Sequence, residues 1–127
     1  MGVTSHQSPD LGLNIEIKER QADILVSFTG ESKSKSPGDF LNPILQDILK
    51  LAKVGEKSII LDFNALKYMN SSTVAPLIKY WSTVKETGAR LVVEYDGSIK
   101  WQKTNFSALA VFATESDKFE LRDSCDA

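Results

Sequence analysis

Three consecutive hydroxyl side chains follow an apolar segment and precede an amphipathic one. Ser71, Ser72 and Thr73 come directly after Asn70, and the residues behind them repeat apolar positions at helical spacing. This order predicts a turn from a strand into a helix, with the hydroxyls beside the unpaired backbone N–H groups of the first helical turn. Those groups and the positive end of the helix favour an anion such as a phosphate. The hydroxyls are therefore candidates for reversible phosphorylation.

The same residues also have a purely structural interpretation. Serine and threonine are favoured N-cap residues, and such a cap contributes about 1 kcal/mol to the helix. Pro76 bears on the choice of cap, because proline is best tolerated in the first helical turn. If Thr73 is the N-cap, Pro76 is the third helical residue. We therefore expect Thr73 as the cap, with Ser71 and Ser72 in the turn before the helix and at least one hydroxyl facing solvent.

Other chemistries find little support in the sequence. Cys125 is the only cysteine, so neither an internal disulfide nor a cysteine-based metal site is expected. His6 is the only histidine and lies in a polar N-terminal segment, which argues against a serine hydrolase built on Ser71. The glycines of residues 30–38 lack the spacing of a Walker phosphate loop. The sequence thus predicts a protein that is not an enzyme and that uses no cofactor and no metal.

Composition is that of an ordinary globular domain. The chain has 127 residues, of which 42% are hydrophobic and 25% are charged. The net charge of -2 provides no basic face for nucleic acid. Residues 1–12 lack the apolar core of a signal peptide, and no segment is long enough to cross a bilayer. These features favour a cytoplasmic protein that binds neither nucleic acid nor a membrane.

Hydrophobic periodicity predicts an α/β domain in the order β-β-α-β-α-β-α-β. The expected strands cover residues 13–19, 22–29, 58–63, 90–95 and 118–122. The first two form a hairpin, and the third is a central strand covered on both faces. Residues 1–12 are expected to be a disordered tail, residues 13–122 the domain, and residues 123–127 a second tail.

The expected helices follow a mobile loop over residues 30–38. The first helix has two possible starts, Ser36 as N-cap with Pro37 next or Asn42 as N-cap with Pro43 next, and it ends at Gly55. The second reaches residue 88, and the third covers residues 98–105. The core is expected to join the third strand to the second helix through six apolar side chains: Ile60, Leu61, Phe63, Leu77, Ile78 and Trp81.

Part of this pattern resembles the STAS domain of bacterial anti-sigma factor antagonists. The resembling residues are Ile-Ile-Leu-Asp-Phe-Asn-Ala-Leu-Lys-Tyr-Met-Asn-Ser-Ser-Thr-Val-Ala-Pro-Leu-Ile from position 59 and Thr-Gly-Ala-Arg-Leu-Val-Val from position 87. The family pattern is an apolar strand, Asp-Ser-Ser/Thr-Gly-Leu-Gly, a helix, a glycine-containing turn and a second apolar strand. The similarity extends from about Ile15 to Leu121, and it implies a single STAS-like domain with helices packed against a mixed sheet.

The resemblance also implies a function and two partners. Such domains bind a serine kinase of the GHKL type that acts as an anti-sigma factor, and phosphorylation of a serine in the turn abolishes that binding. A PP2C-type phosphatase restores it. By position, Ser71 matches the phosphoacceptor, Ser72 is the second choice, and Asn70 stands where the family has an acidic residue. Thr73 and Ala75 replace the two glycines, which places side chains where a kinase must approach.

The loops that follow successive strands are expected to supply the partner-binding surface. Loops at the carboxyl ends of strands gather at one edge of an open α/β sheet. This rule brings residues 70–73 together with Gly30 and Glu31 after the second strand and with Asp96 and Ser98 after the fourth. The alternative interpretation is a STAS-like module without phosphorylation, which serves as a scaffold or binds a small molecule.

Overall fold

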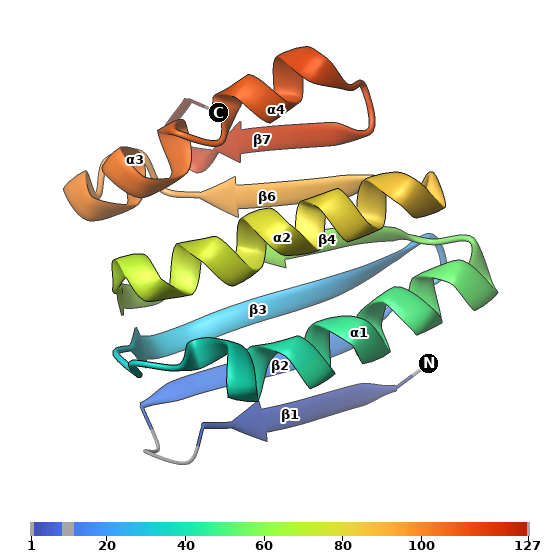
Figure 1. The fold of residues 1–127 in the computed structure, drawn as a ribbon, viewed down its shortest axis with the longest axis horizontal. Helices are drawn as coiled ribbons and strands as arrows, with labels where there is room; N and C mark the ends of the chain where they lie inside the picture. The colour runs from blue at the N-terminus through green and yellow to red at the C-terminus, as the bar shows by residue number, and fades with distance from the viewer. Residues whose placement is uncertain (1, 9–11, 127) are drawn as a thin grey trace.

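The computed structural model describes residues 2–8 and 12–126, with all their side chains except those of residues 71 and 126. Its chain forms a mixed seven-stranded sheet with helices packed against it, as Figure 1 shows, which confirms the α/β class. The strands are β1 Val3–Gln7, β2 Leu13–Glu19, β3 Asp23–Ser32, β4 Ser58–Asp62, β5 Leu66–Met69, β6 Leu91–Tyr95 and β7 Phe119–Asp123. The helices are α1 Pro37–Gly55, α2 Ser71–Thr87, α3 Lys100–Ser107 and α4 Ala110–Glu115, followed by the 3₁₀ turn η1 Ser124–Asp126.

The long strand β3 organises the sheet. The strand order is β1-β2-β3-β4-β6-β7; β1–β2 and β2–β3 are antiparallel, and the other pairs are parallel. The first half of β3 pairs with β4, and its last residues pair with β5. The register shifts between Gly30 and Glu31. Gly30 has a φ of +84°, and a Cβ there would lie 2.0 Å from the carbonyl oxygen of Gly12, so only glycine fits.

The helices build one core on one face of the sheet. Strand side chains such as Val26 and Leu61 cluster there with Leu45 of α1, Trp81 of α2 and Phe106 of α3. In Figure 1, α1 and α2 lie in front of the sheet and run roughly along its strands, and α4 packs against β7. The period-2 alternation of the strands explains why their other side chains point to the opposite face.

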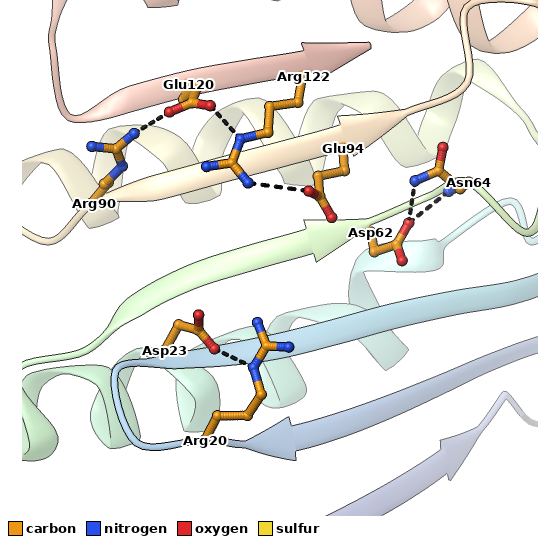
Figure 2. A network of polar contacts seen from close by, with 8 residues as sticks. All are labelled: Arg20, Asp23, Asp62, Asn64, Arg90, Glu94, Glu120 and Arg122. Carbon is orange, nitrogen blue, oxygen red and sulfur yellow. Dashed lines mark hydrogen bonds and ion pairs between the residues drawn. The ribbon is translucent and has the colours of Figure 1, made fainter. Parts of the chain in front are cut away.

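The opposite face carries a network of charged side chains, drawn in Figure 2. Glu120 contacts both Arg90 and Arg122, and Nη1 of Arg122 lies 3.3 Å from Oε2 of Glu94. The hydrogen bond from Arg122 lowers the pKa of Glu120. Ile60 is also buried but stands outside the core cluster. The two faces of β4 are therefore covered unequally, by helices on one side and by apolar and long charged side chains on the other.

The first helix follows one of its two predicted starts. Ser36 is the N-cap residue and Pro37 the first helical residue, while Pro43 lies inside the helix. Gly55 is the last residue of α1, and the left-handed position that follows is taken by Glu56 with a φ of 53°. The predicted end is thus confirmed, although a non-glycine residue adopts the left-handed conformation.

Several sequence expectations are wrong. Val3–Gln7, expected to be disordered, form β1 and pair with β2; the rest of that predicted tail includes residues 1 and 9–11, which lie outside the described residues. β3 continues to Ser32, which shortens the predicted loop, and α3 begins two residues later than predicted. β5 and α4 were not predicted, because they are four and six residues long and too short for a clear period.

Candidate functional site

The start of α2 is fixed by Asn70 rather than by one of the hydroxyl residues. Asn70 is the N-cap, with φ -77° and ψ 165°, and its Oδ1 accepts a hydrogen bond from the backbone N–H of Thr73 at 3.2 Å. The same oxygen accepts a second bond from the Thr73 hydroxyl at 2.8 Å. The Thr73 N–H also donates to the backbone carbonyl oxygen of Asn70 at 3.1 Å, so Asn70 caps the first helical turn with both its side chain and its backbone.

The prediction that Thr73 is the N-cap is consequently wrong. α2 begins at Ser71, so both serines belong to the first turn of the helix rather than to the turn before it. Pro76 is then the sixth helical residue and lies inside the helix. It removes one intrahelical bond, to the carbonyl oxygen of Ser72, because proline has no N–H. Ser72 is exposed, so water can satisfy that carbonyl.

Thr73 and Ser72 differ in accessibility. Thr73 is only 3% exposed, and its Oγ1 lies 2.7 Å from the buried Oγ of Ser32 at the end of β3. Ser72 is exposed. Ser71 is the first helical residue, at the positive end of the helix dipole. Thr73 is thus a packing residue, and the two serines remain the candidates for modification.

Asn70 also ties the loop before α1 to the start of α2. Its Nδ2 donates to the carbonyl oxygen of Ser34 at 2.9 Å, and its backbone N–H donates to the carbonyl oxygen of Ser32 at 3.0 Å. Ser32 pairs with Met69 in the β3–β5 ladder, which brings these segments side by side. The end of β3, the following loop and the first turn of α2 therefore form one hydrogen-bonded unit.

The remaining predicted contact residues lie at the same edge of the sheet. Figure 1 shows that β3, β4 and β6 end toward the N-terminal end of α2. Glu31 is half-buried and pairs with Lys33 at 3.3 Å. Asp96 accepts hydrogen bonds from the hydroxyl of Ser98 at 2.6 Å and from its backbone N–H at 3.0 Å, and the hydroxyl bond lowers the pKa of Asp96. Asp96 and Ser98 thus stabilise their own turn.

Gln102 organises this edge of the sheet, although no pattern in the sequence marks it. Its side chain is 0% exposed; its Nε2 donates to the carbonyl oxygens of Phe63 at 2.8 Å and Leu66 at 3.1 Å. Its Oε1 accepts from the N–H of Asp96 at 2.8 Å. A glutamine in a short polar helix has no periodic signal that marks it as buried. Gln102 nonetheless joins the loop after β4 to the loop after β6.

Two aromatic side chains flank this edge. Tyr68 of β5 is 40% exposed, and its ring centroid lies 6.2 Å from that of Trp101 on α3. Trp101 is half-buried and also contacts Phe106. Partly exposed tyrosine and tryptophan are enriched at protein interfaces. The pair therefore extends the candidate surface from α2 to α3.

The arrangement contains binding features rather than reaction chemistry. Within residues 2–8 and 12–126, no group of three His, Cys, Asp or Glu side chains gathers as a metal site. No helix of the described chain is long and apolar enough to span a membrane. What the edge offers is an exposed hydroxyl at a helix start, a polar hydrogen-bonded unit behind it and an aromatic pair beside it.

Comparison with known proteins identifies the fold. No family model and no curated protein matches this sequence. An anti-sigma factor antagonist from Mycobacterium paratuberculosis has a similar structure, with 14% identity, a TM-score of 0.57, and coverage of 95% of this chain and 93% of that one. SiaC from Pseudomonas aeruginosa, solved in its apo form, matches with 17% identity, a TM-score of 0.59, and coverage of 96% and 99%. The chain therefore has a STAS-like fold that resembles the fold of anti-sigma factor antagonists.

Proposed function

We propose that this domain is a regulatory module that binds a protein partner and that phosphorylation of Ser71 switches the binding off. Ser72 is the second candidate for the modified residue. The observation that supports the proposal best is the position of the two serines in the first turn of α2, with the neighbouring hydroxyl of Thr73 buried. The fold that this chain has in common with an anti-sigma factor antagonist supports a protein partner over a substrate.

A phosphate at this position would leave the fold intact. It adds about -1.5 to -2 charges at pH 7, and the first turn of a helix stabilises negative charge. None of the residues 71–74 is acidic, so no negatively charged side chain at the helix start repels the phosphate. The cost would fall on binding, because a dianion must be desolvated in an interface that fits a neutral hydroxyl.

The partners in this proposal come from the resemblance to anti-sigma factor antagonists. They are an anti-sigma factor serine kinase of the GHKL type, which binds the unmodified domain, and a PP2C-type phosphatase, which removes the phosphate. The exchange would take place in the cytosol. The proposed contact residues are Asn70, Ser71, Ser72, Gly30, Glu31, Asp96 and Ser98. Thr73 is buried, so it would support the surface without contacting the partner.

Intact-mass measurement tests the modification. The tagged chain would be purified from its native cells as wild type, Ser71→Ala, Ser72→Ala and Ser82→Ala. Ser82 is exposed on the same helix, away from its start, and serves as the matched control. We expect one phosphate on wild type and on Ser82→Ala, and none on Ser71→Ala. Phosphate that persists in Ser71→Ala but disappears in Ser72→Ala would assign the modification to Ser72 instead. Absence of phosphate from wild type would contradict the proposed switch.

Binding is tested separately with a charged variant. Ser71→Asp should keep the melting temperature of wild type but bind the proposed GHKL-type partner kinase at least tenfold more weakly, which corresponds to about 1.4 kcal/mol. Ser82→Asp carries the same charge on the same helix and should bind like wild type. Because aspartate carries only one charge, the phosphorylated domain is the stricter sample. Equal kinase affinity of the phosphorylated and unmodified domains would contradict the proposal.

A further inference from the structure

A cavity of about 370 Å³ lies beside the hydrogen-bonded unit at the start of α2. It opens between the beginning of β2, the end of β3 and the first turn of α1. Leu13, Pro37 and Phe40 give it an apolar surface. Its volume falls within the range of pockets that hold small molecules, and it is too small for a folded segment of another protein.

The charged residues at the cavity favour a cation. Glu31, Lys33 and Asp39 line it, so the described lining residues present two carboxylates against one ammonium group. Lys33 pairs with Glu31 at 3.3 Å, and Asp39 has no ion-pair partner within the described part of the chain. A ligand with an apolar body and a protonated amine would satisfy both the apolar surface and the remaining carboxylate.

The cavity wall is continuous with the start of α2. Ser32 and Ser34 line the cavity, and these are the two residues that Thr73 and Asn70 contact. The hydroxyl of Ser32 lies 2.7 Å from that of Thr73, and the carbonyl oxygen of Ser34 accepts from Asn70. A ligand that shifts residues 32–34 therefore acts on the N-cap of the helix that carries the candidate serines.

We propose that this cavity binds a small amphipathic amine and that binding alters the first turn of α2 through Ser32 and Ser34. The site is distinct from the proposed phosphorylation site, and it requires neither a modified serine nor a protein partner. Ligand occupancy would change how firmly Asn70 and Thr73 hold the helix start. The expected ligand class is an aromatic or aliphatic body that carries one primary amine.

Nuclear magnetic resonance titration of the isotope-labelled full chain tests both parts. The probes are benzylamine, benzyl alcohol and benzoate, which share a ring and differ in charge. We expect saturable shifts with benzylamine at the amides of residues 31–40, with a dissociation constant on the order of 1 mM, and at least tenfold weaker binding of benzoate. The side-chain amide of Asn70 and the backbone amide of Thr73 should shift along the same saturation curve.

Variants separate the cavity from general surface effects. Asp39→Asn should remove most of the preference for benzylamine over benzyl alcohol, and this exposed residue can be changed without touching the core. Phe40→Ala should weaken all probes. Val54→Ala, at the far end of α1 and 89% exposed, should change nothing. Absence of saturable shifts in wild type, or equal binding of all three probes, would contradict the amine-binding site. Shifts that include Ser34 but not Asn70 would contradict the effect of binding on the start of α2.

Discussion

The side-chain amide of Asn70 donates a hydrogen bond to the carbonyl oxygen of Ser34 at 2.9 Å, across 36 residues of sequence. At the same time its Oδ1 accepts from the backbone and hydroxyl of Thr73. An aspartate at this position would offer the same acceptor but no donor. Asparagine therefore adds a connection to the loop before α1 that a carboxylate cannot make.

Substitutions of Asn70 should separate these two roles. Asn70→Ala loses the cap and the bond to Ser34, and we expect the free energy of unfolding to fall by about 1–2 kcal/mol. Asn70→Asp keeps the cap and gains a favourable charge at the helix start, so its melting temperature should stay closer to wild type. Hydrogen exchange of residues 33–36 should nonetheless accelerate in both variants. Unchanged exchange in Asn70→Asp would show that the bond to Ser34 does not hold the loop.

Gln102 should be among the most sensitive polar residues of the chain. Gln102→Ala removes the side-chain partner of the carbonyl oxygens of Phe63 and Leu66 and of the N–H of Asp96, and a buried group left unpaired costs about 1–3 kcal/mol. The carbonyl oxygen of Phe63 still accepts from the backbone N–H of Leu66, so the loss falls mainly on the other two groups. We expect a loss of about 3 kcal/mol or more in urea unfolding. Gln46→Ala, at an exposed position of α1, is the matched control and should lie within about 0.5 kcal/mol of wild type. A small loss in Gln102→Ala would contradict its bridging role.

Elements with a clear period were predictable from the sequence. β2 and the first part of β3 alternate apolar and polar residues, and α1 repeats apolar residues along one face, so their types and approximate ends follow from local patterns. β1 has no such pattern, and it forms because its backbone pairs with β2. The STAS-like order of elements could be recognised because it depends on these longer segments.

The candidate site was only partly predictable because its geometry depends on distant contacts. The sequence predicted Ser71 and Ser72 in the turn before the helix, whereas both belong to the first turn of α2. The prediction of Thr73 as cap is wrong, because Asn70 caps the helix and Pro76 is accommodated inside it. The partners that decide the matter, Ser32 and Ser34, lie about forty residues earlier. No local sequence pattern predicts a hydrogen bond between residues that lie so far apart in the chain.

Trp81 and Ile78 should respond very differently to truncation. Trp81 is 3% exposed and its ring lies 4.8 Å from that of Phe119, so Trp81→Ala should cost about 3–5 kcal/mol. Ile78 was expected in the same core but is 38% exposed, so Ile78→Ala should cost roughly 1 kcal/mol or less. Thermal and urea unfolding of both variants check this. Equal losses of stability in the two variants would mean that α2 is rotated about its axis, so that Ile78 also faces the core.

Tyr80 provides a test of burial on the same helix. The residue is 3% exposed, and its hydroxyl has no hydrogen-bond partner within the described part of the chain. A buried polar group without a partner destabilises the folded state by about 1–3 kcal/mol. Tyr80→Phe removes only that oxygen, so we expect unchanged or higher stability, by about 1 kcal/mol. A clear loss of stability in urea unfolding at pH 7 would indicate that the hydroxyl has a partner in solution.

The same tyrosine should make the domain sensitive to alkali. Burial raises the pKa of Tyr80, because the charged phenolate is disfavoured away from water. The unfolded chain loses this proton near pH 10, whereas the folded chain retains it. The stability contributed by the neutral form is therefore complete below pH 10 and is lost as the pH rises above it. Unfolding between pH 8 and about 11.5 should show a steeper decline for wild type than for Tyr80→Phe. Tyr68→Phe, at a 40% exposed position, is the control and should decline like wild type. Parallel curves for wild type and Tyr80→Phe would mean that the ring of Tyr80 reaches solvent.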